Sequence, residues 1–224
     1  MPSRPGPHLL APSPDVLAEI LRPDVNLCVW QRRLPPELDA WLHMEAVTRS
    51  FETAMRPGSG PTDLTPLVGG LRPCAERDAL LADIHLLARV FAELAGRPPR
   101  LAELSLVGDD SCRKLHADEV GLRLLVTYAG PGTEWAPNDA VVRSALSARG
   151  LDRDAANRAI VPDLGRLRRA GTGDVLVMKG TTYRPNDVGG LVHRSPPIEH
   201  VGSRRVVLKL CDGTYHAHAH DARA

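Results

Sequence analysis

The chain has 224 residues, of which 43% are hydrophobic, and this apolar content is enough for one large domain. Its 28 basic and 27 acidic residues nearly cancel and are spread along the chain, so we expect no nucleic-acid partner and no binding to a membrane surface. With no apolar stretch near the length of a membrane span and no apolar core of a secretory signal, we expect a cytoplasmic protein. The four cysteines form no Cys-x-x-Cys pair, which disfavours a disulfide framework and a zinc ribbon.

The first hundred residues are predicted to be mainly helical. Residues 1–13 are rich in proline and serine and are expected to form a disordered tail. Ser13 predicts the N-cap of a short helix, and a second helix is expected after Pro36. A third helix, over about residues 75–95, has the clearest apolar stripe. We therefore expect a helical N-terminal region over residues 14–99.

Short apolar runs replace the helical stripes in the second half of the chain, and they predict β-strands. Glycine-rich turns separate them. The runs cover residues 101–107, 122–128, 174–178 and 204–211. A helical insertion over about residues 138–169 interrupts the series. The predicted fold class is therefore α+β, with a β-rich unit over residues 100–215.

The C-terminal segment, residues 216–224, contains three histidines at alternating positions. Alternation would place His216, His218 and His220 on one side of an extended strand, and three imidazoles can hold a zinc ion. Short histidine-rich tracts are weak compositional signals. A solvated terminus is therefore favoured over a metal site.

One His-x-Asp motif, His116 and Asp118, precedes an apolar run, and residues two apart in a strand share a face. A distant histidine must supply the third ligand, and His193 has the best context because it follows Gly-Gly and a short apolar segment. Two imidazoles and one carboxylate leave one side of a divalent metal open, as in non-haem Fe(II) oxygenases. The alternative is that Asp118 caps a turn, His116 is a core histidine and His193 lies in a loop.

The order of these motifs resembles the Fe(II)/2-oxoglutarate-dependent oxygenases, over about residues 101–215. Those enzymes fold as a double-stranded β-helix, a jelly-roll or cupin-like barrel. Their pattern is His-x-Asp, a long gap, a second histidine, and then an arginine opening the last strand. The stretch GDVLVM matches the strand that precedes their distal histidine. The resemblance implies a barrel of this type with the helical N-terminal region packed on it.

The resemblance also implies roles for individual residues. It assigns the metal to His116, Asp118 and His193. Arg204 would pair with the far carboxylate of 2-oxoglutarate. Arg205 is the alternative, because a shift of one residue along a strand reverses which side chain faces the pocket. Tyr128 would add a hydrogen bond to the same carboxylate.

The whole chain resembles a bacterial family, the domain of unknown function 1826. The likeness is carried by LRPDVNLCVWQRRLP near the N-terminus, then LHADEVGLRLLVTYAGPGTEW, and then GDVLVMKG to GLVHRSPP. The family has no established reaction. The resemblance implies a metal-linked role and a metal-handling protein as partner.

Two hypotheses follow. The first is an oxygenase that uses Fe(II) and 2-oxoglutarate to oxidise a small-molecule or protein substrate. The second is a non-catalytic zinc-binding protein of metal homeostasis on the same barrel, which needs no cation such as Arg204 deep inside. A hydrolytic zinc enzyme is a lesser option, with Glu134 as its candidate base. Ser195 lies beside Pro-Pro, outside any nucleophile elbow, and is not a credible nucleophile.

Overall fold

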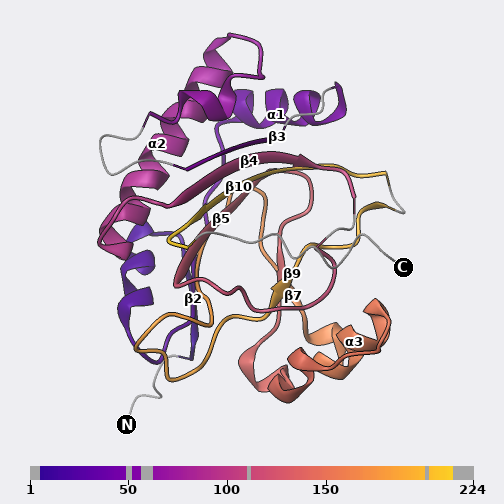
Figure 1. Ribbon diagram of the computed structural model, residues 1–224. Helices are drawn as coiled ribbons and strands as arrows, with labels where there is room; N and C mark the ends of the chain where they lie inside the picture. Colours follow the sequence, from indigo (N-terminus) through magenta and orange to yellow (C-terminus); the bar gives the residue numbers. More distant parts are fainter. Residues whose placement is uncertain (1–5, 49–51, 57–62, 110–111, 200–201, 214–224) are drawn as a thin grey trace.

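The computed structural model describes residues 6–48, 52–56, 63–109, 112–199 and 202–213 (Figure 1). The histidines at 216, 218 and 220 lie outside these residues. The strands are β1 (His8–Ala11), β2 (Leu27–Trp30), β3 (Glu52–Met55), β4 (Leu101–Val107), β5 (Leu122–Ala129), β6 (Glu134–Trp135), β7 (Arg168–Arg169), β8 (Val175–Lys179), β9 (His193–Arg194) and β10 (Arg205–Cys211). The α-helices are α1 (Pro36–Thr48), α2 (Ala75–Ala95) and α3 (Arg153–Ile160). Short 3-10 helices cover Pro14–Leu21, Thr65–Val68, Asn138–Ala140, Arg143–Ser147 and Leu164–Arg166.

The protein has a mixed α/β fold built on two sheets. The large sheet has the strand order β1-β2-β8-β5-β10-β4-β3, and the small sheet has the order β7-β6-β9. All neighbouring strands are antiparallel except β1 and β2. Figure 1 shows α1 and α2 on one side of the large sheet and the small sheet, with α3 beyond it, on the other.

Burial alternates along β5 between two apolar clusters. Leu124 and Val126 belong to the cluster shared with α1 and α2, whereas Leu125 belongs to the one between the sheets. Every residue of β5 is buried, as expected for a central strand covered on both faces. Strands of the two sheets can therefore present side chains to one another in the space between the sheets.

The helix α2 matches its prediction. Leu80, Ile84, Leu87 and Phe91 form its buried stripe. Gly96 ends it in the left-handed conformation, with φ +67°, which glycine adopts without steric cost. The predicted strands over 101–107, 122–128, 174–178 and 204–211 are also confirmed to within a residue or two, as β4, β5, β8 and β10.

The N-terminal half departs from its prediction. Residues 8–11 were expected in a disordered tail but form β1, which pairs with β2. Both β2 and β3 fall inside the expected helical region and extend the two edges of the large sheet. Four-residue strands carry too little periodicity to be recognised, and pairing with β8 and β4 decides their conformation. The insertion over 138–169 contains three short 3-10 helices, the α-helix α3 and the strand β7.

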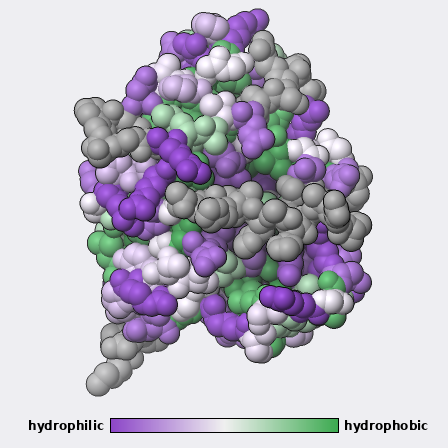
Figure 2. All heavy atoms as spheres, viewed as in Figure 1, coloured by the Kyte–Doolittle hydropathy of each residue, from purple (hydrophilic) through white to green (hydrophobic). Residues whose placement is uncertain are grey.

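On the face seen in Figure 2, hydrophilic residues cover most of the area and hydrophobic residues lie between them in small groups. None of the helices in the described parts of the chain combines the length and the apolar character of a membrane span.

The strand β1 contains a histidine, His8, whose pKa is lowered in the folded chain. The imidazole of His8 lies against the indole of Trp135, with 4.7 Å between ring centroids, and its Nε2 is 3.4 Å from Oδ1 of Asn138. Burial lowers the pKa of His8 to about 4, although the hydrogen bond to Asn138 opposes this. His8 is therefore neutral in the folded chain at neutral pH.

We expect the free energy of unfolding to decrease as the pH falls from about 6.5 to about 4. In this window the unfolded chain binds a proton at His8 that the folded chain does not, so acid favours unfolding. The loss reaches at most about 3 kcal/mol. Urea unfolding at pH 7 and pH 4.5 measures it. The variant His8→Gln should show a shallower pH dependence than wild type or than His43→Gln, which changes an exposed histidine of α1. Equal slopes for all three proteins would contradict the assignment.

Candidate metal centre

Backbone pairing brings His116 and His193 together. The N–H of His116 donates to the carbonyl of His193 at 3.1 Å, and the N–H of His193 donates to the carbonyl of His116 at 2.9 Å. Residues paired in this way in an antiparallel ladder present their side chains on the same face. The two imidazole centroids accordingly lie 4.7 Å apart.

Asp118 completes the group. Its Oδ1 lies 3.5 Å from Nε2 of His116, and its Oδ2 lies 3.3 Å from Nε2 of His193. Its backbone carbonyl accepts the N–H of Thr181 at 2.8 Å. A Cβ at Gly180 would lie 2.6 Å from that carbonyl oxygen, so only glycine lets the two segments approach so closely. One ligand atom from each of the three predicted residues lies within 4.8 Å of the others.

The donor atoms fit a divalent cation. Nδ1 of His116 lies 2.8 Å from the carbonyl of Lys114, and Nδ1 of His193 lies 3.3 Å from the carbonyl of Leu191. A proton on each Nδ1 would make these hydrogen bonds and leave each Nε2 with a lone pair facing the site. Both carboxylate oxygens of Asp118 are buried, and in the described part of the chain they are approached by the two imidazoles and by the guanidinium of Arg123. A bound cation would satisfy these oxygens.

The protonation states suit metal binding. Burial alone would raise the pKa of Asp118, but the charge of His193, a hydrogen bond from His116 and the charge of Arg123 hold it well below its usual range. Burial lowers the pKa of His193 to about 4, against the attraction of Asp118. At neutral pH the site therefore offers an ionised carboxylate and a neutral buried imidazole, which are the forms that bind metals.

Arg123 belongs to the site although the sequence analysis did not select it. Its Nη1 lies 2.8 Å from Oδ2 of Asp118, and its side chain is buried. It faces the space between the sheets because Leu122 and Leu124, on either side of it in β5, face the helices. A single arginine inside the otherwise apolar, buried run from Leu122 to Val126 was the signal that could have identified it.

Arg205, not Arg204, faces the interior. Arg205 is 2% exposed and lines a cavity with His116 and His193, whereas Arg204 is exposed and reaches toward α1, with Nη1 3.5 Å from the carbonyl of Ala46. The first-choice assignment of the 2-oxoglutarate arginine is therefore wrong, and the alternative, one residue along the strand, has the interior position. Arg205 is the first residue of β10 and Arg204 directly precedes it, and successive residues of an extended chain point to opposite sides.

The guanidinium of Arg205 is held by neutral groups. It donates to the carbonyl of Pro131 at 2.7 Å and to the hydroxyls of Ser195, Thr133 and Thr127 at 2.9, 3.1 and 3.2 Å. Among the described residues no carboxylate lies within ion-pair distance of it. Burial lowers its pKa to about 10, so it keeps its charge at neutral pH. It is a buried cation that lacks an anionic partner in the described part of the chain.

The predicted role of Tyr128 is wrong. Its side chain belongs to the cluster beneath the helices, on the face of β5 turned away from the metal ligands. Its hydroxyl donates to Oδ2 of Asp83 at 2.6 Å, and Asp83 also accepts two hydrogen bonds from Arg32, at 2.6 and 2.7 Å. Tyr128 therefore fastens α2 to the large sheet and does not contact the site.

We expect Tyr128→Phe to lower the free energy of unfolding by roughly 1.5–3 kcal/mol, because it removes a buried hydrogen bond to a charged group. Denaturant unfolding followed by circular dichroism measures the change. Tyr183→Phe is the matched control, since no hydrogen bond of its hydroxyl is found among the described residues. Metal content should not change in either variant, and its loss in Tyr128→Phe would show that the residue acts at the site after all.

Glu134 does not face the metal ligands either. Its carboxylate lies 2.5 Å from Nη2 of Arg169 and 2.8 Å from Nε of Arg194. Its neighbour Trp135 is the residue that pairs with His193, and successive residues of a strand face opposite sides of the sheet. The candidate base of the hydrolytic hypothesis is therefore on the wrong face and tied to two arginines. Ser195 accepts a hydrogen bond from Arg205, in keeping with a structural role.

Fold and site together define a mixed α/β protein with a candidate His-Asp-His metal centre between its two sheets. The chain belongs to the family of proteins of unknown function DUF1826, whose model matches residues 11–211. A comparison with curated proteins found no match.

Several solved structures are similar to the chain. The auxin-oxidation dioxygenase 1 of Arabidopsis thaliana, in a complex with 2-oxoglutarate, is 12% identical, with 92% of each chain covered and a TM-score of 0.46. Apo HygX of Streptomyces hygroscopicus is 13% identical, with 88% of this chain and 85% of that one covered and a TM-score of 0.46. A prolyl-4-hydroxylase of Pseudomonas putida is 10% identical, with 88% and 96% covered and a TM-score of 0.43. Likeness at this level carries no argument about the site.

Proposed function

We propose that this protein is a metal-dependent oxygenase that uses Fe(II) and 2-oxoglutarate. The observation that supports it most is the shared cavity between the sheets. His116 and His193, two of the three candidate metal ligands, line it together with the buried guanidinium of Arg205. A site for a metal ion and a site for an anion are thus built into the same space.

The strand connections support a double-stranded β-helix. From β4 onward the chain passes between the sheets in turn. The large sheet receives β4, β5, β8 and β10, and the small sheet receives the His116 bridge, β6, β7 and β9. Such a double-sheet arrangement of eight segments is that of a jelly roll. In this barrel β1, β2 and β3 are additions at the edges of the large sheet.

Arg205 supports a dicarboxylate as cosubstrate. Burying a guanidinium among neutral groups is unfavourable unless an anion accompanies it. Its planar donors can bind a carboxylate in two-pronged fashion. We propose that one carboxylate of 2-oxoglutarate binds at Arg205 while its keto-acid end reaches the open side of the metal.

The protein's own contribution is to bind, orient and exclude water. Asp118 and the two imidazoles would hold the ion, and Arg123 adds a positive charge that, after His193 and His116, favours the ionised form of Asp118. Val107, Leu125 and Val207 form the apolar part of the cavity wall and limit the access of water. When bound, Fe(II) with 2-oxoglutarate and O2 supplies oxidation of a substrate C–H bond, with succinate and CO2 as co-products.

A zinc-binding protein of metal homeostasis needs the three ligands but has no use for Arg205. The position of this arginine therefore favours the oxygenase over the carrier.

Anaerobic titration and turnover test the proposal. Protein loaded with Fe(II) under argon should bind 2-oxoglutarate once per chain, and protein without metal should bind it much more weakly. Admission of O2 should then release succinate, slowly when no substrate is present. A protein loaded with zinc should bind the cosubstrate without releasing succinate. Tight metal binding with no detectable binding of 2-oxoglutarate would contradict the oxygenase and leave the carrier.

A further inference from the structure

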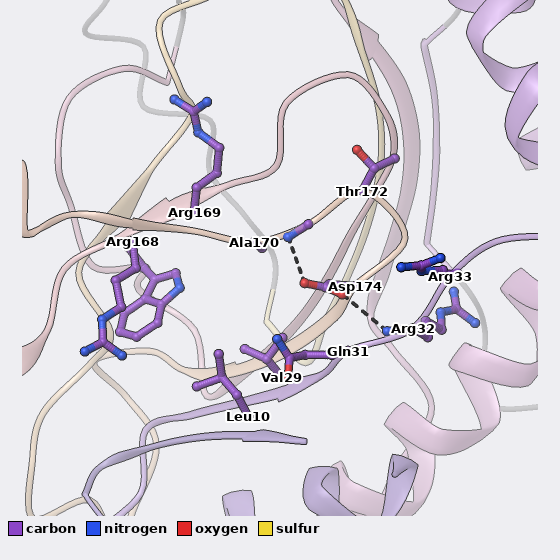
Figure 3. Close-up of a pocket in the computed structure, with 12 residues that line it drawn as sticks. Leu10, Val29, Gln31, Arg32, Arg33, Arg168, Arg169, Ala170, Thr172 and Asp174 are labelled. Atoms are coloured by element: carbon purple, nitrogen blue, oxygen red, sulfur yellow. Dashed lines mark hydrogen bonds between the residues drawn. The ribbon is translucent and has the colours of Figure 1, made fainter. Parts of the chain in front are cut away.

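A second pocket, of about 420 Å³, lies where the end of β2 meets the segment from β7 to β8 (Figure 3). This volume is within the range of small-molecule sites. Four arginines line it: Arg32, Arg33, Arg168 and Arg169. It shares no lining residue with the cavity of the metal centre.

The walls of this arginine pocket are fastened to each other. Asp174 accepts the backbone N–H of Arg32 at 3.3 Å and the backbone N–H of Gly171 at 2.7 Å, and Figure 3 shows both bonds. The side chain of Arg32 donates to the carbonyl of Gly173 at 2.9 Å. Gly173 has φ +86°, a conformation that favours glycine. The pocket is therefore largely preformed.

Two of the four arginines already have acidic partners. Arg32 makes a two-pronged ion pair with Asp83, and Arg169 pairs with Glu134. Arg33 and Arg168 are exposed, and neither has an ion-pair partner among the described residues. Figure 3 shows these two on opposite sides of the pocket.

The guanidinium of Arg168 is oriented by an aromatic ring. Its Cζ lies 5.4 Å from the centroid of the Trp135 indole. An arginine stacked in this way keeps its in-plane N–H groups available to an anion. Trp135 pairs with Arg168 of β7 on one side and with His193 of β9 on the other, so the strand β6 lies between the arginine of the pocket and the candidate metal ligand.

We propose that the arginine pocket binds a small phosphate monoester. A monoester carries between −1.5 and −2 charges at neutral pH, and Arg33 and Arg168, the two lining arginines without an ion-pair partner among the described residues, give the pocket a matching surplus of positive charge from its two sides. Thr172 and Gln31 add polar groups to the lining, and Leu10 and Val29 add an apolar surface for the organic part of the ligand. The carboxylate of Asp174 also lines the pocket, and it is held in place by two backbone N–H groups that donate to it.

Isothermal titration with phenyl phosphate, inorganic phosphate and benzoate at constant ionic strength tests the proposal on the full chain. Phenyl phosphate should bind more tightly than inorganic phosphate, and benzoate should bind more weakly than either. The double variant Arg33→Ala/Arg168→Ala should weaken binding of phenyl phosphate at least about tenfold. The double variant Arg149→Ala/Arg158→Ala removes the same charge from exposed positions elsewhere and should bind like wild type.

Three results would overturn the proposal: no binding of phenyl phosphate to wild type, equal weakening in the two double variants, or benzoate binding as tightly as phenyl phosphate. Metal content and binding of 2-oxoglutarate are measured in the same proteins. Neither should change in Arg33→Ala/Arg168→Ala, so the outcome does not depend on whether the protein is an oxygenase.

Discussion

Substitution of His116 or Asp118 by alanine is expected to reduce metal content from about one ion per chain to background. Each residue supplies one of three donor atoms that lie within 4.8 Å of one another. With only two donor atoms left, the site is expected to bind a divalent ion much more weakly than with three. Metal analysis of protein loaded with Fe(II) under argon and passed through a desalting column measures the loss.

The two variants should differ in their effect on folding stability. His116 is 27% exposed at its side chain, so its removal should affect folding little. Asp118 is 2% exposed, and its removal leaves Arg123 without the carboxylate 2.8 Å away, so some loss of stability is expected as well. His43→Ala, in an exposed position of α1, is the control for loss of a histidine. Full metal content in folded His116→Ala and Asp118→Asn would show that these residues do not hold the ion.

Substitution of Arg205 by alanine is expected to abolish binding of 2-oxoglutarate while metal stays bound. The guanidinium is buried in the cavity and is the group proposed to pair with a carboxylate. Loss of one partner of a buried, hydrogen-bonded charge pair costs about 2–5 kcal/mol, which corresponds to roughly 30-fold to several thousand-fold in affinity. Anaerobic titration of Fe(II)-loaded protein with 2-oxoglutarate measures it.

The neighbour of Arg205 offers the matched control. Arg204→Ala removes the same charge from the position directly before β10, but Arg204 is exposed and reaches the other side of the sheet. Its affinity for 2-oxoglutarate should equal that of wild type. Arg205→Lys keeps the charge without the planar donors and should bind with intermediate affinity. Equal effects of Arg204→Ala and Arg205→Ala would mean that net charge, and not the buried guanidinium, governs binding.

The sequence predicted those parts of the fold whose pattern is local. The apolar residues of α2 recur at helical spacing, and the strands β4, β5, β8 and β10 are apolar runs followed by turn residues. The three candidate ligands were also found, because their pattern can be recognised in the sequence alone. It consists of His-x-Asp before an apolar run and a later histidine after Gly-Gly.

Features that depend on pairing between distant segments were missed. The strands β1, β2 and β3 are each four residues long and are defined by their neighbours in the sheet. The choice between Arg204 and Arg205 depends on the register of β10 against β4 and β5, which no local pattern reports.

Tyr128 was misplaced for the same kind of reason. Its position after the apolar run suggested proximity to the cosubstrate, but alternation along β5 turns it toward Asp83 of α2. Arg123 lies near the start of β5 and on the same face as Thr127, and its guanidinium contacts Asp118. In a central strand, the side of the sheet on which a side chain lies can be decided only when the surroundings of a neighbouring residue of that strand are known.

Anomalous diffraction at the iron absorption edge, from crystals of protein loaded anaerobically with Fe(II), tests the central claim most directly. We predict one strong peak per chain, within bonding distance of Nε2 of His116, a carboxylate oxygen of Asp118 and Nε2 of His193. A peak at any other position, or an imidazole of His193 outside the coordination sphere, would contradict it.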